Sequence, residues 1–376
     1  MKILFIIGTL GGGGAEKLLR DILPLLNTYH NIECELLVIS DKDDKYSKQL
    51  ISQGVSCTFL PKIIKGHIAK IQYINNFIKK GGYNIVHAHL FPALYYCSVI
   101  KRFKYKDVSF IFTEHNTDNR RRHIVWIRPL EKWIYKPYDC IISISNQTKI
   151  ELIKWIKPKD KKKYITINNG VPIDQFVSAM SYKRSKIDTR LTKRDILLCM
   201  IGSFTQQKNH IFMIDIMKQL TAEYKILLLG EGVLEDEIKA YVHNSGLEDQ
   251  VIFMGFRRDV AEIIKTSDIV VIPSLWEGFG LIAVEAMACE KQVVCSDVPG
   301  LSEVVGSAGM KVKAGDTDGF LKAIKFAAGN IGNKDIESKC REQAGKFDIN
   351  IMIKEYVDIY KLLAKTKNMK KAENKK

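Results

Sequence analysis

Short β-branched runs alternate with longer amphipathic stretches along most of the chain, and this alternation limits the possible folds more than any other feature. Helical patterns such as residues 15–26 and 68–79 separate the runs of the first half. Strands that alternate with helices are typical of βαβ units, which form parallel sheets. We therefore predict an α/β fold. The expected strands of the first half are residues 3–7, 35–39, 55–60, 85–87, 109–113, 140–144 and 164–167.

The same alternation starts again after a polar stretch at residues 178–194. A chain of 376 residues, 46% of them apolar, is long enough to fill two hydrophobic cores. We expect two doubly wound, Rossmann-like domains that face each other across a cleft, with a linker near residues 172–195. The expected strands of the second half are residues 196–201, 225–229, 251–254, 269–272 and 293–296.

These patterns predict four segments. We expect an N-terminal Rossmann-like domain at residues 1–175 and a C-terminal one at residues 190–346. Residues 347–366 are expected to form a last helix that crosses back to the first domain. The segment 367–376 is rich in lysine and asparagine and is expected to be a disordered basic tail.

Composition indicates a cytoplasmic protein. No apolar stretch is long enough to span a bilayer, and the chain starts without the features of a signal peptide. The eight cysteines lie scattered in apolar runs without a C-x-x-C pair, so we expect them to be reduced core residues.

The net charge of +16 is concentrated in the first half. Residues 1–175 carry 28 Lys and Arg against 15 Asp and Glu, and residues 51–106 contain nine basic residues and no acid. Such a surface favours an anionic partner, for example a membrane, although a merely solvated basic face is the alternative. We expect no nucleic-acid partner, because no recognition-helix, zinc or RNA-binding pattern is present.

Two early segments could bind a ligand. Four glycines ending at Gly14 follow the first expected strand and open a helix, where backbone N–H groups can meet an anion. A dinucleotide fingerprint fails there, because Glu16 occupies the position of its last glycine, and a turn that only permits close packing is another alternative. The carboxylates of Asp41, Asp43 and Asp44 lie in a polar loop that we expect to be solvated, so we predict no metal and no cofactor.

The second half contains two stronger segments. Gly202 and Lys208 occupy its first expected strand-to-helix turn, where a lysine beside a helix start suits a diphosphate. Further on, residues 269–272 lead into a turn with Glu277 and then into a helix of small residues that contains Glu285. The amides of that turn can bind phosphate, and a carboxylate among apolar neighbours requires a polar partner such as a sugar hydroxyl or a salt bridge.

These motifs together resemble the retaining GT-B glycosyltransferases of glycosyltransferase family 4, which includes bacterial enzymes of surface polysaccharide synthesis. EGFGLIAVE, which runs from Glu277 to Glu285, matches that family's E-x7-E motif, and the resemblance covers nearly the whole chain. The supporting matches are GGGGAEKLL at 11–19, HAH at 87–89, TEHN at 113–116, SISN at 143–146, INNGV at 167–171, QKN at 207–209, LLLGEG at 227–232, MGFRRDV at 254–260 and SDVPGLSEVV at 296–305.

The resemblance implies roles for the residues in these motifs. Glu277 would contact the transferred sugar and Glu285 the ribose, while Lys208 would counter the diphosphate charge. His115 would match the family's histidine beside the donor sugar, so His115, Lys208 and Glu277 are the expected catalytic residues. The expected donor-binding residues are Gly14, Gly202, Ser203, Lys208, Phe256, Arg257, Glu277, Gly278, Phe279, Gly280, Leu281 and Glu285.

One position departs from the family. Many relatives have an arginine where this chain has Ser203. Serine can donate a hydrogen bond to phosphate but carries no charge, so either Lys208 contributes more or another cation such as Arg257 helps.

The resemblance implies transfer of a hexose or N-acetylhexosamine from a nucleoside-diphosphate sugar, with UDP as the expected nucleotide, with retention and without a metal. The expected acceptor is a lipid-linked or growing saccharide in capsule or exopolysaccharide synthesis. The N-terminal domain would bind this acceptor and the anionic inner face of the cell membrane, and the C-terminal domain would bind the donor. The alternatives are a nucleotide-sugar epimerase of the same fold, which needs no acceptor, and a non-catalytic nucleotide-sugar or membrane-binding scaffold.

Overall fold

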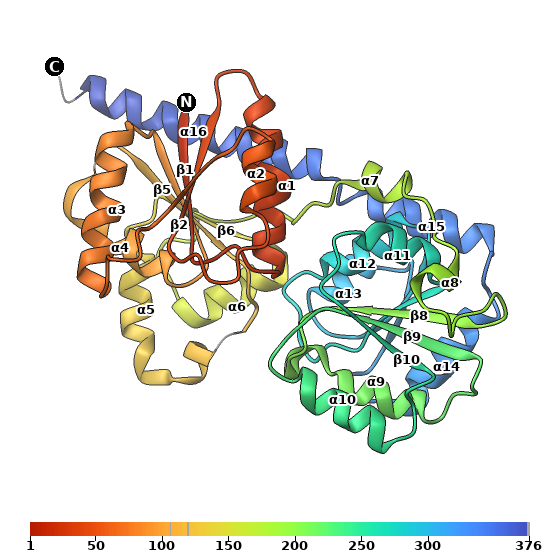
Figure 1. Cartoon of the computed structure of the whole chain (residues 1–376). Coiled ribbons are helices and arrows are strands. Elements are labelled where there is room, and N and C mark those ends of the chain that lie inside the picture. Colours follow the sequence, from red (N-terminus) through yellow and green to blue (C-terminus); the bar gives the residue numbers. More distant parts are fainter. Residues whose placement is uncertain (106, 119, 374–376) are drawn as a thin grey trace. The chain divides into compact units, whose positions relative to one another are not determined.

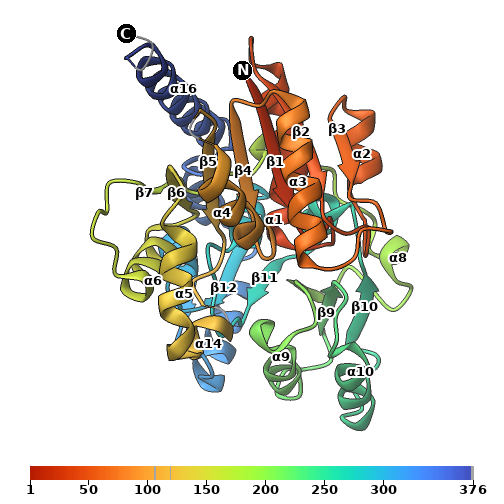
Figure 2. The ribbon, with the colours of Figure 1, turned by 90° about the vertical axis from the view of Figure 1, so that its left-hand side faces the viewer.

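The computed structural model describes residues 1–105, 107–118 and 120–373, and the chain divides into two compact units. The first unit comprises Met1–Gly170 and Ile349–Lys376, and the second comprises Val171–Asp348. Each unit is built around one parallel sheet with helices packed on it (Figure 1, Figure 2). The predicted α/β fold with two Rossmann-like domains is therefore confirmed.

The sheet of the first unit has seven strands in the order β3-β2-β1-β4-β5-β6-β7, and each neighbouring pair is parallel. Its order reverses between β1 and β4, where loops diverge to opposite faces and ligands commonly bind. The strands are β1 (Lys2–Ile7), β2 (Glu33–Val38), β3 (Ser56–Phe59), β4 (Ile85–His89), β5 (Ser109–Glu114), β6 (Cys140–Ser143) and β7 (Tyr164–Thr166).

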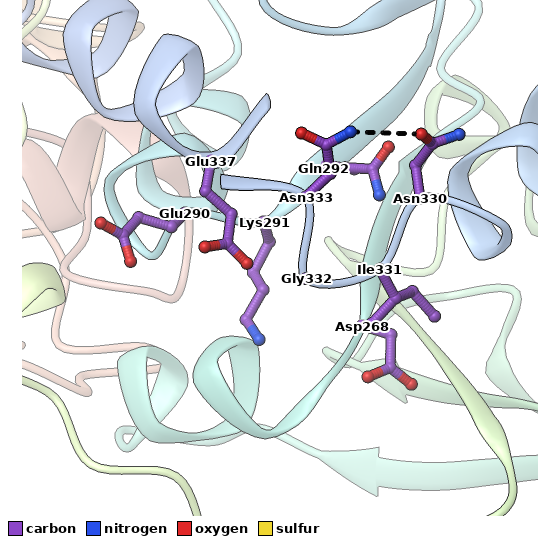
Figure 3. A pocket seen from close by; sticks show the side chains of 9 residues that line it. All are labelled: Asp268, Glu290, Lys291, Gln292, Asn330, Ile331, Gly332, Asn333 and Glu337. Carbon is purple, nitrogen blue, oxygen red and sulfur yellow. Dashed lines mark hydrogen bonds between the residues drawn. The ribbon is translucent and has the colours of Figure 1, made fainter. Parts of the chain in front are cut away.

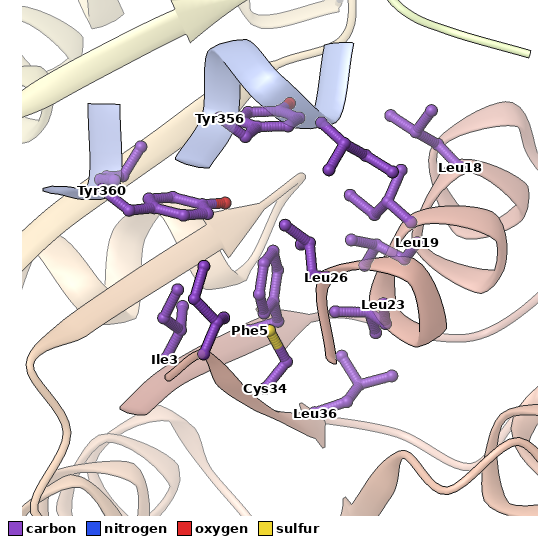
Figure 4. Close-up of a cluster of buried hydrophobic side chains, with 14 of the residues drawn as sticks. Ile3, Phe5, Leu18, Leu19, Leu23, Leu26, Cys34, Leu36, Tyr356 and Tyr360 are labelled. Atoms are coloured by element: carbon purple, nitrogen blue, oxygen red, sulfur yellow. The ribbon is translucent and has the colours of Figure 1, made fainter. Parts of the chain in front are cut away.

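The helices of the first unit bury apolar clusters on both faces of this sheet. In one cluster, Tyr356 and Tyr360 of the last helix pack with Phe5 and with leucines of the first helix (Figure 4). The elements are α1 (Gly14–Thr28), α2 (Ser47–Ser52), α3 (His67–Gly81), α4 (Ala93–Lys104), η1 (Arg120–His123), η2 (Val125–Ile127), α5 (Arg128–Tyr135), α6 (Asn146–Ile156) and α16 (Ile349–Glu373).

Helix α16 follows the second unit in sequence but is part of the first. Its buried residues Ile349, Met352, Ile353 and Tyr356 belong to the same apolar cluster as β1 and α1. The helix extends to Glu373, so it includes most of the segment expected to be a disordered tail. Residues 374–376 of that segment lie outside the described residues.

The second unit contains a six-stranded sheet in the order β10-β9-β8-β11-β12-β13, with parallel neighbours throughout. The strand β13 was not predicted, because it has only three residues, the middle one an exposed lysine, and therefore shows no apolar run. The strands are β8 (Ile196–Ile201), β9 (Tyr224–Leu229), β10 (Val251–Gly255), β11 (Ile269–Ile272), β12 (Gln292–Ser296) and β13 (Met310–Val312).

Helices follow the strands of the second unit, and the order of its sheet reverses between β8 and β11. The residues expected to be a linker are anchored to this unit, since Arg184 donates two hydrogen bonds of 2.7 Å to the carboxylate of Asp268. The helices are α7 (Ile173–Val177), α8 (Arg184–Ile187), η3 (Gln206–Lys208), α9 (His210–Met217), α10 (Glu235–Asn244), α11 (Val260–Thr266), α12 (Leu281–Ala288), α13 (Leu301–Val305), α14 (Thr317–Ala328) and α15 (Lys334–Gly345).

The state of the cysteines and the apolar character of the helices complete the description of the fold. All eight cysteines are free thiols, seven of them buried and Cys57 partly buried. No helix within the described part of the chain combines the length and the apolar character that crossing a membrane requires.

Candidate active site

The centre of the candidate site is the turn between β11 and α12. Strand β11 is buried along its whole length, and α12 begins at Leu281, directly after Gly280. Gly280 has φ +94°, a left-handed conformation that glycine adopts without strain. Residues 283–288 of α12 are buried, which fixes the helix against the unit and presents its positive N-terminal end at the turn.

Glu277 lies within this turn and is 7% exposed. Its Oε1 atom accepts hydrogen bonds from the ammonium group of Lys208 and, at 2.9 Å, from the hydroxyl of Ser274. Burial of a carboxylate is costly unless a charge or a donor compensates it, and here both do. Ser274 was missed in the sequence analysis, although it lies three residues before Glu277.

The turn after β8 is attached to the turn after β11. The backbone N–H of Leu275 donates to the carbonyl of Gln207 at 2.8 Å, and the Gln207 side chain donates to the carbonyl of Trp276 at 2.8 Å. A Cβ on Gly202 would lie 3.0 Å from Cε of Lys208, so this glycine leaves room for the lysine side chain. Because β8 and β11 are neighbours at the reversal point, Lys208 and Glu277 meet at the carboxyl edge of the sheet.

A third segment packs against the same turn. A Cβ on Gly300 would lie 2.8 Å from the carbonyl oxygen of Glu277 and 2.9 Å from that of Gly278. Gly300 has φ +87° and directly precedes α13. Only glycine allows this close approach, by which the backbone at Gly300 packs against the turn that contains Glu277. The segment matches a family motif, but Gly300 was not predicted as a site residue.

The remaining donor-site candidates of the second unit lie on several different elements and differ in exposure. Glu285 is 1% exposed within α12, and Phe279 is 2% exposed, whereas Ser203 is exposed. Phe256 and Arg257 follow β10, the edge strand two places from β8. Arg257 donates to both oxygens of Asp259, and this hydrogen-bonded pair raises the pKa of Arg257 and lowers that of Asp259.

Two candidates belong to the first unit. Gly14 is the first residue of α1, after β1. His115 follows β5, is 8% exposed, and its Nε2 lies 2.9 Å from Nδ1 of His89. Burial lowers the pKa of His115 to about 3 and those of His87 and His89 well below the usual range. All three imidazoles are therefore neutral at physiological pH.

The histidines form a connected group. His87 pairs through Nδ1 with the hydroxyl of Tyr360 at 2.8 Å and through Nε2 with that of Thr113 at 2.7 Å. His89 Nε2 is buried and has no hydrogen-bond partner among the described residues. From the sequence, residues 87–89 were recognised only as a family match, because alternation in a strand does not reveal which buried polar groups meet.

The carboxylates considered for a metal have other contacts. Asp41 forms an ion pair of 2.8 Å with Lys62, and Asp44 accepts a 2.9 Å hydrogen bond from the backbone of Ser47. Among the residues that the structure describes, no group of three or more His, Cys, Asp and Glu side chains is placed to hold a metal ion.

A pocket of the second unit lies away from this site (Figure 3). Asp268 and Gln292, at the amino ends of β11 and β12, contribute to its lining with Lys291 and Glu337. Ligands of doubly wound sheets bind at the carboxyl edge, so this pocket is not the candidate active site.

Two Rossmann-like units, each built on a parallel sheet, are the architecture of the GT-B class of glycosyltransferases. Two family profiles match the two halves of the chain. The profile "Glycosyltransferase Family 4" matches residues 12–175, and "Glycosyl transferases group 1" matches residues 195–330. The chain belongs to glycosyltransferase family 4.

Individual relatives agree with this assignment. The chain is 23% identical to an N-acetylgalactosamine-N,N'-diacetylbacillosaminyl-diphospho-undecaprenol 4-alpha-N-acetylgalactosaminyltransferase of Campylobacter jejuni, over 92% of this chain and 96% of the relative. It is 26% identical to the UDP-Gal:alpha-D-GlcNAc-diphosphoundecaprenol alpha-1,3-galactosyltransferase of Escherichia coli, over 61% of this chain and 62% of the relative. The match thus spans less than two thirds of the E. coli enzyme.

Solved structures share the fold. The structure of Anabaena Alr3699/HepE in complex with UDP-glucose superposes with a TM-score of 0.80 at 19% identity, covering 96% of this chain and 99% of the other.

Proposed function

We propose that the protein is a retaining glycosyltransferase that moves a hexose or N-acetylhexosamine from a UDP-sugar to a lipid-linked or growing saccharide in surface polysaccharide synthesis. The observation that carries this proposal is the meeting of Lys208 and Glu277 beside the N-terminus of α12, at the reversal point of the second sheet. The Lys208 ammonium suits a diphosphate and the Glu277 carboxylate suits sugar hydroxyls. The diphosphate and the sugar of a nucleotide-sugar would therefore find complementary groups side by side.

The chemical requirement is to stabilise negative charge on the departing diphosphate while positive charge develops on the sugar ring. In this proposal, Lys208 and the backbone amides of Phe279 to Leu281 bind the diphosphate, and the dipole of α12 adds to their field. These groups act without a metal ion. Glu277 accepts hydrogen bonds from the sugar, and Glu285 accepts hydrogen bonds from the ribose.

Ser203 and Arg257 bear on how the diphosphate is held. Because Nε and Nη2 of Arg257 already donate hydrogen bonds to Asp259, that arginine is a poor substitute for the arginine that many relatives have at the position of Ser203. We infer that Lys208 provides the main side-chain charge and that the exposed Ser203 hydroxyl adds a neutral hydrogen bond.

The acceptor proposal rests on the relatives and on charge. The C. jejuni and E. coli relatives are named for acceptors linked through diphosphate to undecaprenol. Such a lipid lies in a membrane, and the excess of positive charge in residues 1–175 suits an anionic bilayer surface. We therefore propose that the first unit binds the acceptor and contacts the inner face of the cell membrane.

Retention follows from front-face attack, in which the departing phosphate helps to take the acceptor proton. His115, which burial keeps neutral, would lie beside the donor sugar and donate or accept a hydrogen bond without adding charge.

Product analysis tests the proposal. A panel of UDP-sugars is incubated with the enzyme, with and without an undecaprenyl-diphosphate-linked saccharide, and the anomeric configuration of the product is read by NMR. We expect donor consumption that depends on the acceptor and a product with retained configuration. Inversion would exclude the mechanism, conversion of the donor without acceptor would indicate an epimerase, and no turnover would indicate a binding protein.

A further inference from the structure

An exposed apolar surface lies on the first unit, in the segment that joins β5 to β6. The exposed fractions are 81% for Trp126, 73% for Val125, 49% for Leu130 and 40% for Trp133. We call these four residues the tryptophan surface. Single exposed apolar residues are common, but two tryptophans and two aliphatic residues within nine positions form a patch that requires an explanation.

The opposite side of the same segment is firmly packed. On α5, Glu131 is 1% exposed, Ile134 2% and Tyr135 1%. Glu131 forms an ion pair of 3.1 Å with Arg121 and accepts a hydrogen bond from Tyr95 of α4. Helix α5 is therefore fixed to the body of the unit through one face. Leu130 and Trp133, three positions apart, share the other face, which the rest of the described chain leaves exposed.

Positive charge surrounds the tryptophan surface. Residues 120–136 contain six Lys and Arg and one acid, the buried Glu131. Lys132 of α5 and Lys136, which directly follows the helix, are exposed, and the guanidinium of Arg102 lies 3.9 Å from the centre of the Trp133 ring. The nearest acid in the chain with an exposed side chain, Asp118, is paired with His123 at 2.7 Å. An apolar patch with an excess of cations around it is complementary to the interface of an anionic bilayer. Tryptophan rings and basic side chains are favoured there.

The location of the segment links this surface to the reaction proposed above. Helix α5 lies beside α6 (Figure 2), and Tyr135 of α5 donates a 2.6 Å hydrogen bond to Glu114, the last residue of β5. His115 directly follows β5 at the same edge of the sheet. A bilayer that meets the tryptophan surface would therefore bring its lipids to the edge of the unit that carries His115.

We propose that the tryptophan surface inserts into the interfacial region of an anionic phospholipid bilayer and that Trp126 is its deepest residue. The proposal rests on the proposed function, because a lipid-linked acceptor gives the enzyme a reason to bind membranes. Membrane binding would then depend on insertion of the apolar tryptophan surface, and not only on the electrostatic attraction between scattered lysines and anionic lipids. A second copy of the chain is disfavoured as the occupant, since it would bring the same cations face to face.

Vesicle binding by the full chain tests this proposal. Sedimentation with phosphatidylcholine vesicles, with and without phosphatidylglycerol, is compared for the native protein and for Trp126→Ser and Trp133→Ser. We expect binding to the anionic vesicles and a loss of roughly tenfold in the Trp126→Ser partition coefficient. Val233→Ser is the matched control, because Val233 is 90% exposed on the second unit and should not affect binding.

Quenching of tryptophan fluorescence by brominated lipids gives a second measurement, which reports insertion of the ring itself and which loss of stability in a variant would not reproduce. Phospholipids brominated near the headgroup end of the acyl chains should quench native emission, and Trp126→Phe should remove most of the quenching while it preserves binding. Equal binding by native protein and Trp126→Ser, or no quenching by brominated lipid, would overturn the proposal. Concentration-dependent dimers that Trp126→Ser dissociates would also overturn it, since the surface would then bind a second copy.

The proposed function has a separate readout. UDP binding in vesicle-free buffer should be the same for native protein and Trp126→Ser. If UDP binds but vesicles do not, the membrane proposal fails and the glycosyltransferase proposal stands. If UDP does not bind the native protein, the proposed function itself fails.

Discussion

The ammonium group of Lys208 donates a hydrogen bond to the carboxylate of Glu277, although 69 positions separate the two residues in the chain. They meet because β8 and β11 are adjacent in the sheet and the turns after them are joined by hydrogen bonds. The side chains of both are largely buried, with exposed fractions of 19% and 9%. A sugar diphosphate bound here would contact a cation and a carboxylate that already hold each other in place.

Replacement of Lys208 should affect the transition state most strongly. In Lys208→Met, kcat/KM for the UDP-sugar should fall roughly 100-fold or more, because the leaving diphosphate loses its main side-chain charge. Lys218→Met is a suitable control, since Lys218 lies just after α9, is exposed and pairs with Asp215. Steady-state kinetics with both variants checks this, and equal effects of the two substitutions would contradict the assigned role.

Glu277→Gln should separate catalysis from nucleotide binding. The amide no longer neutralises Lys208, so affinity for UDP should be unchanged or higher, while kcat with the UDP-sugar should fall about 100-fold. Titration calorimetry with UDP and initial rates with the sugar donor provide the two values. A parallel loss of UDP affinity and kcat would indicate that Glu277 only maintains the turn.

The close contact at Gly300 should be sensitive to a single methyl group. Gly300→Ala combines a left-handed backbone with a Cβ 2.8 Å from the carbonyl oxygen of Glu277, so it should destabilise the protein by about 2–4 kcal/mol and weaken donor binding. Gly332→Ala is the matched control, because Gly332 has φ +80° but no atom within 4 Å of its Cβ position. Urea unfolding should show a cost of only about 1 kcal/mol there.

Buried histidines should make the protein sensitive to acid. His210 is 2% exposed, packs on Phe204 with ring centroids 4.4 Å apart, and has a pKa lowered to about 4, mainly by burial. Because the unfolded state binds the proton first, folding stability contributed by this residue is lost as pH falls from about 6.5 towards 4.

Substitution of His210 tests this pH dependence. Neither ring nitrogen of His210 has a hydrogen-bond partner in the described part of the chain, so His210→Phe removes an ionisable group without breaking a hydrogen bond. The variant should gain about 2 kcal/mol relative to native protein on going from pH 8 to pH 5. The exposed His30→Phe serves as control. Identical pH profiles of native protein and His210→Phe in urea unfolding would contradict the assignment.

The contact between His89 and His115 should fix a tautomer. A buried N–H without an acceptor is rarer than an unpaired acceptor, so His89 should carry its proton on Nδ1 and donate to His115 Nε2. The proton of His115 then lies on Nδ1. Nitrogen-15 NMR of the imidazoles reads this directly, and a protonated His115 Nε2 would contradict it.

Substitutions of His89 test whether this contact supports catalysis. His89→Asn retains an N–H near the Nδ1 position and should preserve the tautomer and most of kcat, whereas His89→Leu should lose both. Equal activity of the two variants would indicate that His89 only fills space.

Much of the fold could be predicted from the sequence, and most contacts within the site could not. The strands of both sheets follow from apolar runs such as residues 269–272, but the three residues of β13 lie at an edge and carry no such run. The turn at Glu277 was recognised from its glycines and carboxylate. Its contact with Lys208 depends on strand order, which local periodicity does not encode.

Side-chain partners explain the other omissions. Ser274 and His89 were missed because their importance comes from a single hydrogen bond each, to Glu277 and His115. The charge of the first half was predicted to favour membranes, but the exposure of Trp126 depends on which face of its segment packs inward. That choice is made by Glu131 and Tyr135, which contact Tyr95 and Glu114.

Titration of UDP into the native protein and into Lys208→Met, both in EDTA, tests the central claim most directly. If main-chain dipoles and one lysine bind the diphosphate, UDP should bind the native protein in EDTA as tightly as in magnesium, and Lys208→Met should weaken binding at least about tenfold. Binding that requires magnesium, or that is unaffected by loss of Lys208, would contradict the account.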